Sequence, residues 1–301
     1  MRVLDDGDVF GALSMADAVA TVADAFREQA AGTLVAPPRF TVDAGEGNLV
    51  FTAGTARERG VTGVRIYETF PPDAAQTQLT AVWSSETGAF RGLHAGHAVA
   101  GLRTGAIGGV AVDCLARADA ATLGVLGSGP QSRLQATAVD AVRDLDRVQV
   151  YSPTPDHRAA YVDDVDDRVA CPVRARGDPE PVVREADVLV VATDSAEPTF
   201  EAGWVQPGTH VSTLGPKRAS AHEIPLDLLG RADAVATDSL AQVADEPAFF
   251  LPDPASEVVE LGDAVAGDLP DRTDDAVTVF CSVGLAGTEV VLADEALART
   301  G

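Results

Sequence analysis

From residue 120 onward, short apolar strands alternate with helical segments, and this alternation limits the possible folds more than any other feature of the chain. Strands are expected at 121–126, 148–151, 188–192, 210–214 and 234–237, with a shorter one near Val173. Helices are expected at 134–142, 156–166 and 179–186. Apolar strands that alternate with helices form a parallel sheet covered on both faces. The chain is therefore predicted to be an α/β protein with a Rossmann-like, doubly wound parallel sheet.

The first third of the chain has a different pattern. Residues 14–31 predict an amphipathic helix, with Ser14 as its N-cap. Short strands are expected at 39–42, 48–52, 63–67 and 79–84, followed by a hairpin turn at 84–88. A Gly- and Ala-rich helix is expected at 98–115, where close packing must offset the low helix propensity of glycine. These segments predict a smaller α+β domain.

The turn after the strand at 121–126 has the sequence Gly127-Ser128-Gly129-Pro130-Gln131-Ser132. Gly127 permits a sharp turn, and Gly129 lets a diphosphate approach the backbone closely. The following helix directs its unpaired N–H groups at the phosphates. Because the turn lies between a buried strand and a helix of an alternating unit, it predicts a dinucleotide site rather than a purely structural turn.

The residues after the next strand indicate which dinucleotide is bound. An acid at that strand end favours NAD, and its absence beside a base favours NADP. No acid follows Tyr151 directly, and Ser152, Thr154 and Arg158 could hold a 2′-phosphate. The cofactor is expected to be NADP or NAD, with NADP slightly favoured. The alternative is a polar loop with a solvated arginine.

The charge of the chain excludes several partners. It carries 46 Asp and Glu residues against 22 Lys and Arg, a formal net charge of −24. Such a surface repels nucleic-acid phosphates. No segment reaches the roughly 18–20 uninterrupted apolar residues of a membrane helix. The N-terminus has acids where a signal peptide has bases. A cytoplasmic protein that binds neither nucleic acid nor membrane is expected.

Lysine is nearly absent from the chain: Lys217 is the only one. Many acids with almost no lysine are expected of a halophilic protein in a cytoplasm at molar salt, where the Debye length is about 3 Å. An ordinary acidic protein is the alternative. The widely spaced Cys114, Cys171 and Cys281 form no Cys-x-x-Cys pair, and His94 and His97 have no third ligand nearby in sequence. No metal site is expected.

Several segments, in the same order, resemble the ornithine cyclodeaminase/mu-crystallin family. They are Gly63-Val64-Arg65 with Phe70-Pro71, Glu86-Thr87-Gly88, Leu102-Arg103-Thr104-Gly105-Ala106, Leu115-Ala116-Arg117, the turn at 127–131, Ala186-Asp187, Pro207-Gly208-Thr209-His210, and Phe280 with Ser282-Val283-Gly284-Leu285-Ala286. The resemblance covers roughly residues 35–295. A generic Rossmann protein is the alternative.

The resemblance implies a homodimer with two domains. Residues 1–108 with 284–301 would form a substrate-binding and dimerisation domain, and residues 109–283 the dinucleotide-binding domain. It also implies NAD(P)-dependent chemistry on the Cα–N bond of a small amino or imino acid, as in alanine dehydrogenases and ketimine reductases. The alternatives are an ornithine cyclodeaminase, which is an ammonia-lyase with catalytic NAD, and a non-enzymatic NADP-dependent binding protein.

The resemblance also assigns site residues. Arg39 matches a substrate-carboxylate arginine, and Arg103 and Thr104 match residues near substrate and cofactor phosphates. Alternatively, Arg39 is a surface base and Arg103 an interface ion-pair partner. The predicted cofactor set is completed by residues of the turn and of the strand ends: Gly127, Ser128, Gly129, Pro130, Gln131, Ser152, Thr154, Arg158, Thr193, Leu214 and Gly215.

The chain departs from the family at two positions. Arg65 stands where the family has a lysine that handles protons, and a guanidinium is a poor proton shuttle. Lys217 stands near the position of an aspartate of the cyclodeaminases. Our hypothesis is that Lys217, with or without His222, moves the proton while Arg65 binds the carboxylate or polarises the imine. The two catalytic candidates are thus Arg65 and Lys217. Otherwise, His222-Glu223 predicts an ordinary helix start.

Overall fold

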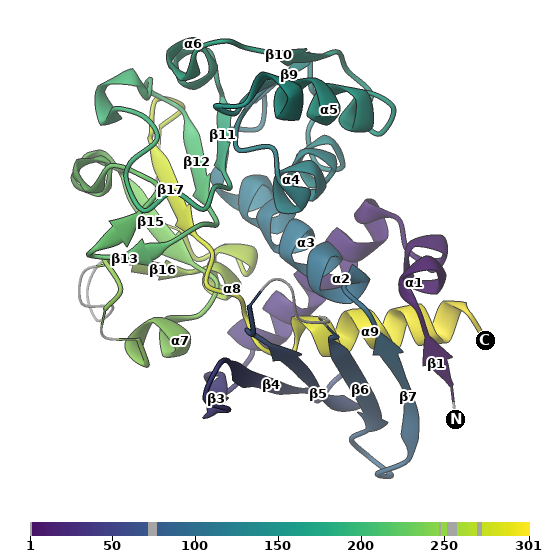
Figure 1. The fold of residues 1–301 in the computed structure, drawn as a ribbon. Coiled ribbons are helices and arrows are strands. Elements are labelled where there is room, and N and C mark those ends of the chain that lie inside the picture. The colour runs from purple at the N-terminus through teal and green to yellow at the C-terminus, as the bar shows by residue number, and fades with distance from the viewer. Residues whose placement is uncertain (1, 72–76, 247, 252–257, 270–272) are drawn as a thin grey trace. The chain divides into compact units, whose positions relative to one another are not determined.

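The computed structural model describes residues 2–71, 77–246, 248–251, 258–269 and 273–301 (Figure 1). The chain divides into two compact units. Unit 1 is Met1–Ala106 with Gly284–Gly301, and unit 2 is Ile107–Val283. The division falls within one helix, α3 (Ala98–Leu115).

Unit 1 is built on a mixed sheet with the strand order β1-β7-β6-β5-β4-β2, and β3 also pairs with β4. Most neighbours are antiparallel, and β1 pairs with β7 in parallel. The strands are β1 (Val3–Leu4), β2 (Leu34–Val35), β3 (Phe40–Asp43), β4 (Asn48–Ala56), β5 (Val61–Glu68), β6 (Leu79–Ser84) and β7 (Phe90–Ala95). The antiparallel strands and the hairpin between β6 and β7 follow the pattern predicted for this part of the chain.

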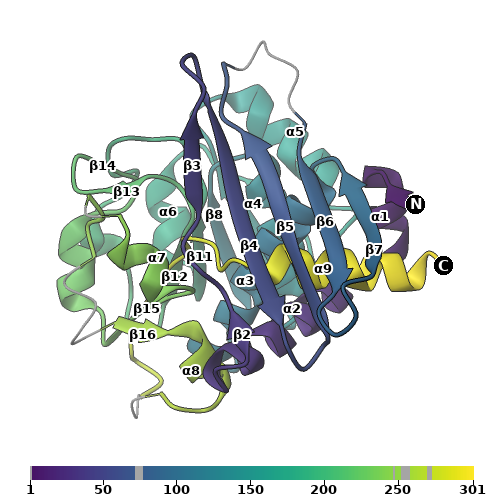
Figure 2. The ribbon, with the colours of Figure 1, turned by 90° about the horizontal axis from the view of Figure 1, so that it is seen from below.

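Helices pack on one face of this sheet, and Figure 2 shows them behind the strands. They are α1 (Asp6–Ala12), α2 (Met15–Ala30) and α9 (Thr288–Arg299). Helix α2 begins as predicted, because the Ser14 side chain accepts a hydrogen bond from Asp17 N and closes a capping box. Helix α9 approaches the sheet closely where a Cβ on Gly54 would lie 2.4 Å from Gly287 Cα. Only glycine fits at this approach.

Unit 2 contains a parallel sheet with the strand order β10-β9-β8-β11-β12-β17-β15-β16. Its strands are β8 (Thr122–Leu126), β9 (Arg147–Tyr151), β10 (Val173–Ala175), β11 (Val188–Val191), β12 (His210–Thr213), β15 (Ala234–Thr237), β16 (Val258–Glu260) and β17 (Thr278–Cys281). The strand order reverses between β8 and β11, and such reversals create a crevice at the carboxyl ends of the strands.

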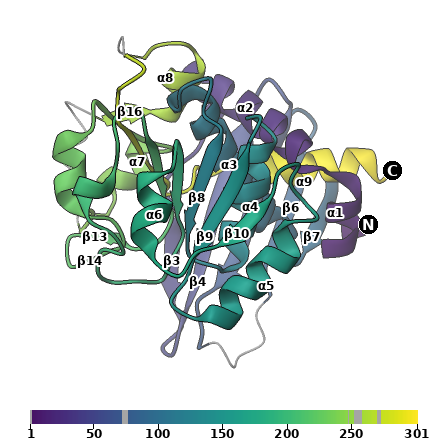
Figure 3. The same cartoon turned by 90° about the horizontal axis from the view of Figure 1, so that it is seen from above.

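Both faces of this sheet are covered, and two hydrophobic clusters show it. Val188 and Val190 of β11 belong to one cluster, and Leu189 and Val191 to the other. Figure 3 shows α5 on one side of the sheet and α6 on the other. The remaining elements of unit 2 are α4 (Pro130–Asp140), α5 (Pro155–Val165), α6 (Pro179–Arg184), α7 (Leu240–Ala244), α8 (Leu261–Val265) and the 3₁₀ segments η1 (Ala202–Trp204) and η2 (Leu226–Arg231). The doubly wound α/β architecture predicted from the sequence is thereby confirmed.

Two local predictions differ from the structure. Helix α4 begins at Pro130 rather than at residue 134, because proline suits a first helical position, where no N–H bond is needed. His222 and Glu223 do not begin a helix. Instead, β13 (Lys217–Arg218) and β14 (Ala221–His222) form a small antiparallel hairpin, and Glu223 follows it.

Helix α3 is long and apolar enough to cross a membrane by length and composition. Within the protein, 67% of it is buried. That burial is typical of a core helix.

Candidate functional site

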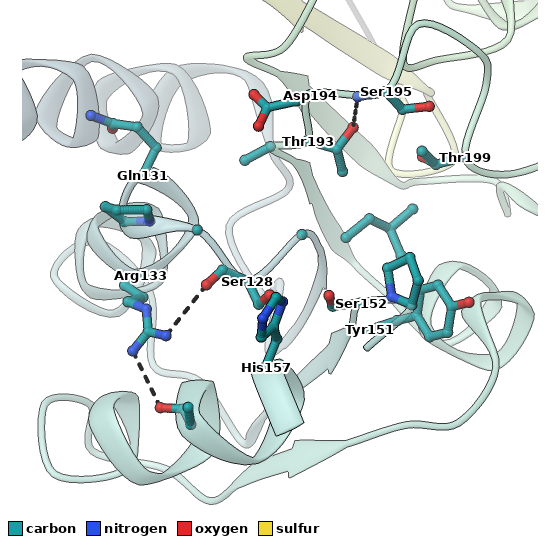
Figure 4. Close-up of a pocket in the computed structure, with 17 residues that line it drawn as sticks. Ser128, Gln131, Arg133, Tyr151, Ser152, His157, Thr193, Asp194, Ser195 and Thr199 are labelled. Carbon is teal, nitrogen blue, oxygen red and sulfur yellow. Dashed lines mark hydrogen bonds between the residues drawn. The ribbon is translucent and has the colours of Figure 1, made fainter. Parts of the chain in front are cut away.

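A cavity of about 770 Å³ lies in unit 2, at the carboxyl ends of β8, β9 and β11 (Figure 4). Its walls come from the segments that follow these three strands. They include residues 126–131, 151–153 and 192–195, together with Arg133, His157, Ala160 and Thr199. All five predicted turn residues, Gly127 to Gln131, line it, as do Ser152 and Thr193.

The turn after β8 has a backbone that only glycine can adopt. Gly127 has φ +107°, and a Cβ there would lie 2.2 Å from the Ala192 carbonyl oxygen. A Cβ on Gly129, in contrast, would meet nothing within 4 Å. Gly129 is the N-cap of α4, and no side chain caps the helix there. The first N–H groups of α4 therefore border an open space at Gly129, which suits a diphosphate.

Two polar side chains of α4 complete this wall. Ser132 stands where the Gly-x-Gly-x-x-Gly turn of dinucleotide-binding folds has its third glycine. It is fully buried, and its hydroxyl donates to the Gly129 carbonyl at 2.8 Å. Gln131 Oε1 is buried and accepts no hydrogen bond from the described residues. A ligand donor in the cavity would satisfy this oxygen. The residues present therefore fit a dinucleotide.

The end of β9 differs in detail from the prediction. Ser152 lines the cavity, but Thr154 and Arg158 are not among its lining residues. Arg158 instead donates to the Ser152 and Pro153 carbonyl oxygens and lies over the Tyr151 ring, 5.8 Å from its centre. His157 and Arg133 line the cavity here, and the sequence reasoning missed both. Their signal was their position in the first turn of a helix that follows a strand end.

Leu214 and Gly215 follow β12 and do not line the cavity. They connect to it through Glu223, whose carboxylate accepts hydrogen bonds from both their backbone N–H groups and from Thr193. Glu223 is fully buried. The sequence reasoning missed its role because a Glu after a His also suits a helix start.

Lys217 lies in β13, across from His222 in β14. Its side chain is buried, and Nζ donates to the Gly215 carbonyl at 2.7 Å. Burial raises the pKa of the Cys281 thiol to about 12, and the Lys217 charge partly opposes that rise. The Lys217 side chain therefore lies beside the loop that follows β12.

The predicted substrate residues lie in unit 1, where they form a cationic cluster of Arg39, Arg65 and Arg103. Arg65 is only 6% exposed, and its Nε and Nη2 donate to Gln78 Oε1 at 3.1 and 2.7 Å. Burial, followed by the positive charge of Arg103, lowers the pKa of Arg65 to about 10. Glu289, which is buried and accepts from Thr52, opposes this shift.

Tyr67 connects two members of this cluster. The Arg65 guanidinium lies over its ring, and Arg39 Nη1 is 3.5 Å from its hydroxyl oxygen. The sequence reasoning missed Tyr67 and Gln78. Tyr67 could have been found, because it lies two residues after Arg65 and so on the same face of a strand.

Arg103 projects from α3. Its Nε is buried with no hydrogen-bond partner among the described residues, and a Cβ on Gly284 would come within 2.7 Å of its Nη1. The hydroxyl of the neighbouring Thr104 donates to the Ala100 carbonyl. An unpaired buried N–H on a guanidinium is suited to an incoming anion.

Comparison with known proteins identifies the family. The model of the ornithine cyclodeaminase/mu-crystallin family matches residues 2–297. The chain belongs to this family. The resemblance inferred from the sequence is thus confirmed.

Three relatives illustrate what the family contains. A Δ¹-pyrroline-2-carboxylate reductase of Bacillus cereus is 34% identical over 201 residues, which is 64% of this chain and 61% of the relative. An alanine dehydrogenase of Archaeoglobus fulgidus is 29% identical over 97% of this chain and 92% of its own length. Among solved structures, an archaeal alanine dehydrogenase dimer with bound NAD has a TM-score of 0.87 at 27% identity, with 99% of this chain and 95% of that one covered.

Proposed function

We propose that this member of the family is an NAD(P)-dependent oxidoreductase that acts on the Cα–N bond of a small amino or imino acid, as alanine dehydrogenases and ketimine reductases do. The observation that carries the proposal is the glycine turn at 127–131, which forms a wall of a cavity large enough for a nucleotide. The similarity to a Δ¹-pyrroline-2-carboxylate reductase and to alanine dehydrogenases supports the same chemistry. When bound, a nicotinamide supplies or accepts hydride.

The chain's own residues would bind the substrate and move its proton. Arg39, Arg65 and Arg103 concentrate positive charge in one region of unit 1, as a carboxylate requires. Arg65 keeps its charge up to about pH 10, so it orients and stabilises an anion and does not shuttle a proton. We assign the proton to Lys217, whose ammonium is buried and hydrogen-bonded to a carbonyl.

We further propose that NADP is preferred over NAD. No carboxylate follows Tyr151 at the end of β9, and the cavity is lined there by Ser152, His157 and Arg133. Arg133 already pairs with Asp164 at 2.9 Å, which leaves His157 as the cavity-lining group best placed to favour a 2′-phosphate. Figure 4 shows His157 beside Ser128 and Ser152.

A homodimer is proposed on the basis of an apolar row along one face of the unit 1 sheet. Strand pairing aligns Phe40, Phe51, Ile66 and Leu79 across β3 to β6. Phe40 is 57% exposed and stacks on Phe51, with ring centres 4.8 Å apart. Phe40 and Leu79 are the exposed members of this row, and exposed apolar patches are frequent at protein interfaces. A second copy of the chain is the proposed occupant.

The composition supports a high-salt cytoplasm as the setting. With a net charge of −24, the chain repels itself and its copies strongly in dilute buffer. Asp294, for example, forms ion pairs with two arginines, Arg59 and Arg91. We propose that molar salt screens the remaining acid excess.

The function is tested by incubating the protein in molar KCl with NADPH or NADH, adding either a cyclic ketimine acid or pyruvate with ammonia, and following absorbance of the reduced nicotinamide. Oxidation of the cofactor supports the proposal. Ammonia release from ornithine without net cofactor change would instead identify a cyclodeaminase. Tight cofactor binding without turnover of any of these substrates would identify a binding protein.

A further inference from the structure

Glu223 connects the ends of two neighbouring strands of unit 2. Its Oε2 accepts from the Thr193 backbone N–H at 2.7 Å and from the Thr193 hydroxyl at 2.8 Å. Its Oε1 accepts from the Thr213 hydroxyl at 2.7 Å, from Leu214 N at 2.9 Å and from Gly215 N. Thr193 follows β11, and the other three donors end or follow β12. One fully buried carboxylate thus joins two strand ends.

The backbone of Glu223 holds the far end of the segment that Thr193 begins. Its carbonyl oxygen accepts from Thr199 N at 2.9 Å and from the Thr199 hydroxyl at 3.1 Å. Between these points, His222 N donates to the Ala196 carbonyl at 3.2 Å. The segment 193–199 is therefore fixed at both ends and at its middle by Glu223 and the residue before it.

This segment forms part of the cavity wall. Thr193, Asp194, Ser195 and Thr199 line the cavity, and Figure 4 shows them along one side of it. The Thr193 hydroxyl donates to the carboxylate, so it is free to accept from Ser195 N, which it does at 3.2 Å. The carboxylate thereby sets the direction of hydrogen bonding along the wall.

Glu223 is also connected to Lys217, through Gly215. A Cβ on Gly215 would lie 2.2 Å from the Thr193 carbonyl oxygen and 2.5 Å from Glu223 Oε2, so this glycine is enclosed between them. The Gly215 carbonyl in turn accepts from Lys217 Nζ. Any movement of the carboxylate would displace both the cavity wall and the carbonyl that positions the lysine.

We propose that Glu223 is a positioning residue that fixes the 193–199 wall of the dinucleotide cavity and the Gly215–Lys217 segment in one arrangement. This inference rests on the proposed function of the cavity. Five donors converge on the carboxylate, and each needs an acceptor. Both oxygens of Glu223 thus act as hydrogen-bond acceptors.

The test compares two amide substitutions at opposite ends of the same sheet. In Glu223→Gln, the new NH₂ group faces N–H or hydroxyl donors and cannot accept from them. Asp187→Asn is the matched control, because Asp187 accepts from Ala121 N and Thr122 N at the amino ends of the strands, away from the cavity. Both variants lose a carboxylate that braces backbone N–H groups, so both are expected to lose stability.

The readout is the Kd for NADPH and for NADH, measured by nicotinamide fluorescence in molar KCl, where circular dichroism shows each protein folded. We expect Glu223→Gln to bind at least about tenfold more weakly, and Asp187→Asn to stay within about twofold of the wild type. Equal affinity in Glu223→Gln and the wild type would overturn the proposal. Equal weakening in both variants would also overturn it, because the loss would then reflect stability alone.

A milder variant covers the case in which Glu223→Gln does not fold. Thr213→Val keeps the shape of a fully buried side chain and removes one of the five donors. It is expected to weaken dinucleotide binding by about threefold; unchanged affinity would contradict the positioning role. If the wild-type protein binds neither dinucleotide, the proposed function of the cavity fails first, and this inference fails with it.

Discussion

The guanidinium carbon of Arg65 lies 4.1 Å from the centre of the Tyr67 ring, and the same guanidinium donates twice to the Gln78 side-chain oxygen. A planar fork can stack on a ring and bond in its plane at the same time, and an ammonium cannot. The surroundings of Arg65 therefore suit a guanidinium and not an ammonium. A general avoidance of lysine in the chain does not by itself account for these contacts.

The first prediction concerns Arg65→Lys, which restores the residue type of the family. We expect the KM for the amino or imino acid to rise at least about tenfold, because a point charge replaces a bidentate fork. The cofactor Kd should not change. Arg59→Lys is the matched control, since Arg59 pairs with Asp294 and Glu295 instead. A lysine variant with unchanged or improved KM would show that the fork is not needed.

The lowered pKa of Arg65, about 10, predicts a dependence on alkaline pH. Below that value the guanidinium is charged, so substrate affinity should hold, and it should fall as pH rises through about 10. Stability moves the opposite way. The unfolded chain keeps the Arg65 proton to a higher pH than the folded chain does, so folding is favoured increasingly as the pH rises above about 10. Substrate affinity and the urea midpoint of unfolding are measured from pH 8 to 11 for the wild type and for Arg65→Gln. If the differences between the two proteins do not change with pH, the assignment of this titration to Arg65 is wrong.

Two glycines of the turn should respond differently to the same substitution. Gly127→Ala places a Cβ against the Ala192 carbonyl at φ +107°, and should cost at least about 2 kcal/mol of unfolding free energy. Gly129→Ala points a methyl group into open space, so stability should change by less than about 0.5 kcal/mol.

Gly129→Ala is expected to weaken dinucleotide binding even though it leaves stability nearly unchanged. Gly129→Ala should weaken NADPH binding about tenfold, because its methyl group occupies the cradle for the diphosphate. Gly177→Ala is the control, since its Cβ also meets nothing within 4 Å and Gly177 does not line the cavity. Undiminished NADPH binding in Gly129→Ala would argue against phosphates at this turn.

Lys217→Met tests the proton role. We expect turnover to fall at least about a hundredfold, which is the usual contribution of a general acid or base, with dinucleotide affinity unchanged. Lys217→Arg places a guanidinium there, which is a poor proton shuttle, so it should not restore activity. Normal turnover in Lys217→Met with normal cofactor affinity would rule the role out.

Salt dependence tests the proposed setting. Because the Debye length grows from about 3 Å at 1 M salt to about 10 Å at 0.1 M, dialysis to dilute buffer should expose the repulsion among 46 acids and unfold the chain. Circular dichroism during stepwise dilution of KCl measures this. A protein that remains fully folded without salt would not be a halophilic one.

The parallel sheet was predictable because its signal is local. Val188 to Val191 is an unbroken apolar run, and its residues alternate between two cores. The turn at 127–131 was equally visible, since two closely spaced glycines between a buried strand and a helix are typical of a phosphate-binding turn. Helix α2 was predictable from Ser14 and its apolar spacing.

What could not be predicted depends on contacts distant in sequence. Glu223 meets Thr193 across 30 residues, and no pattern around either residue indicates the pairing. Gln78 meets Arg65 only because β5 and β6 lie side by side. Arg158 was a reasonable phosphate ligand by position, but carbonyl oxygens of its own loop engage its guanidinium. Local patterns thus located the cavity, while the residues that brace it required the structure.

The most direct measurement is the transfer of deuterium from the nicotinamide to substrate carbon. NADPH and NADH with deuterium at both C4 positions would be incubated with the protein in molar KCl, together with Δ¹-pyrroline-2-carboxylate or with pyruvate and ammonia. The amino acid product would then be analysed by mass spectrometry. We predict one deuterium on Cα of the proline or alanine formed. Product without deuterium at Cα, or no amino acid from either mixture with a protein that is folded and binds the dinucleotide, would contradict hydride transfer to a nitrogen-bearing carbon.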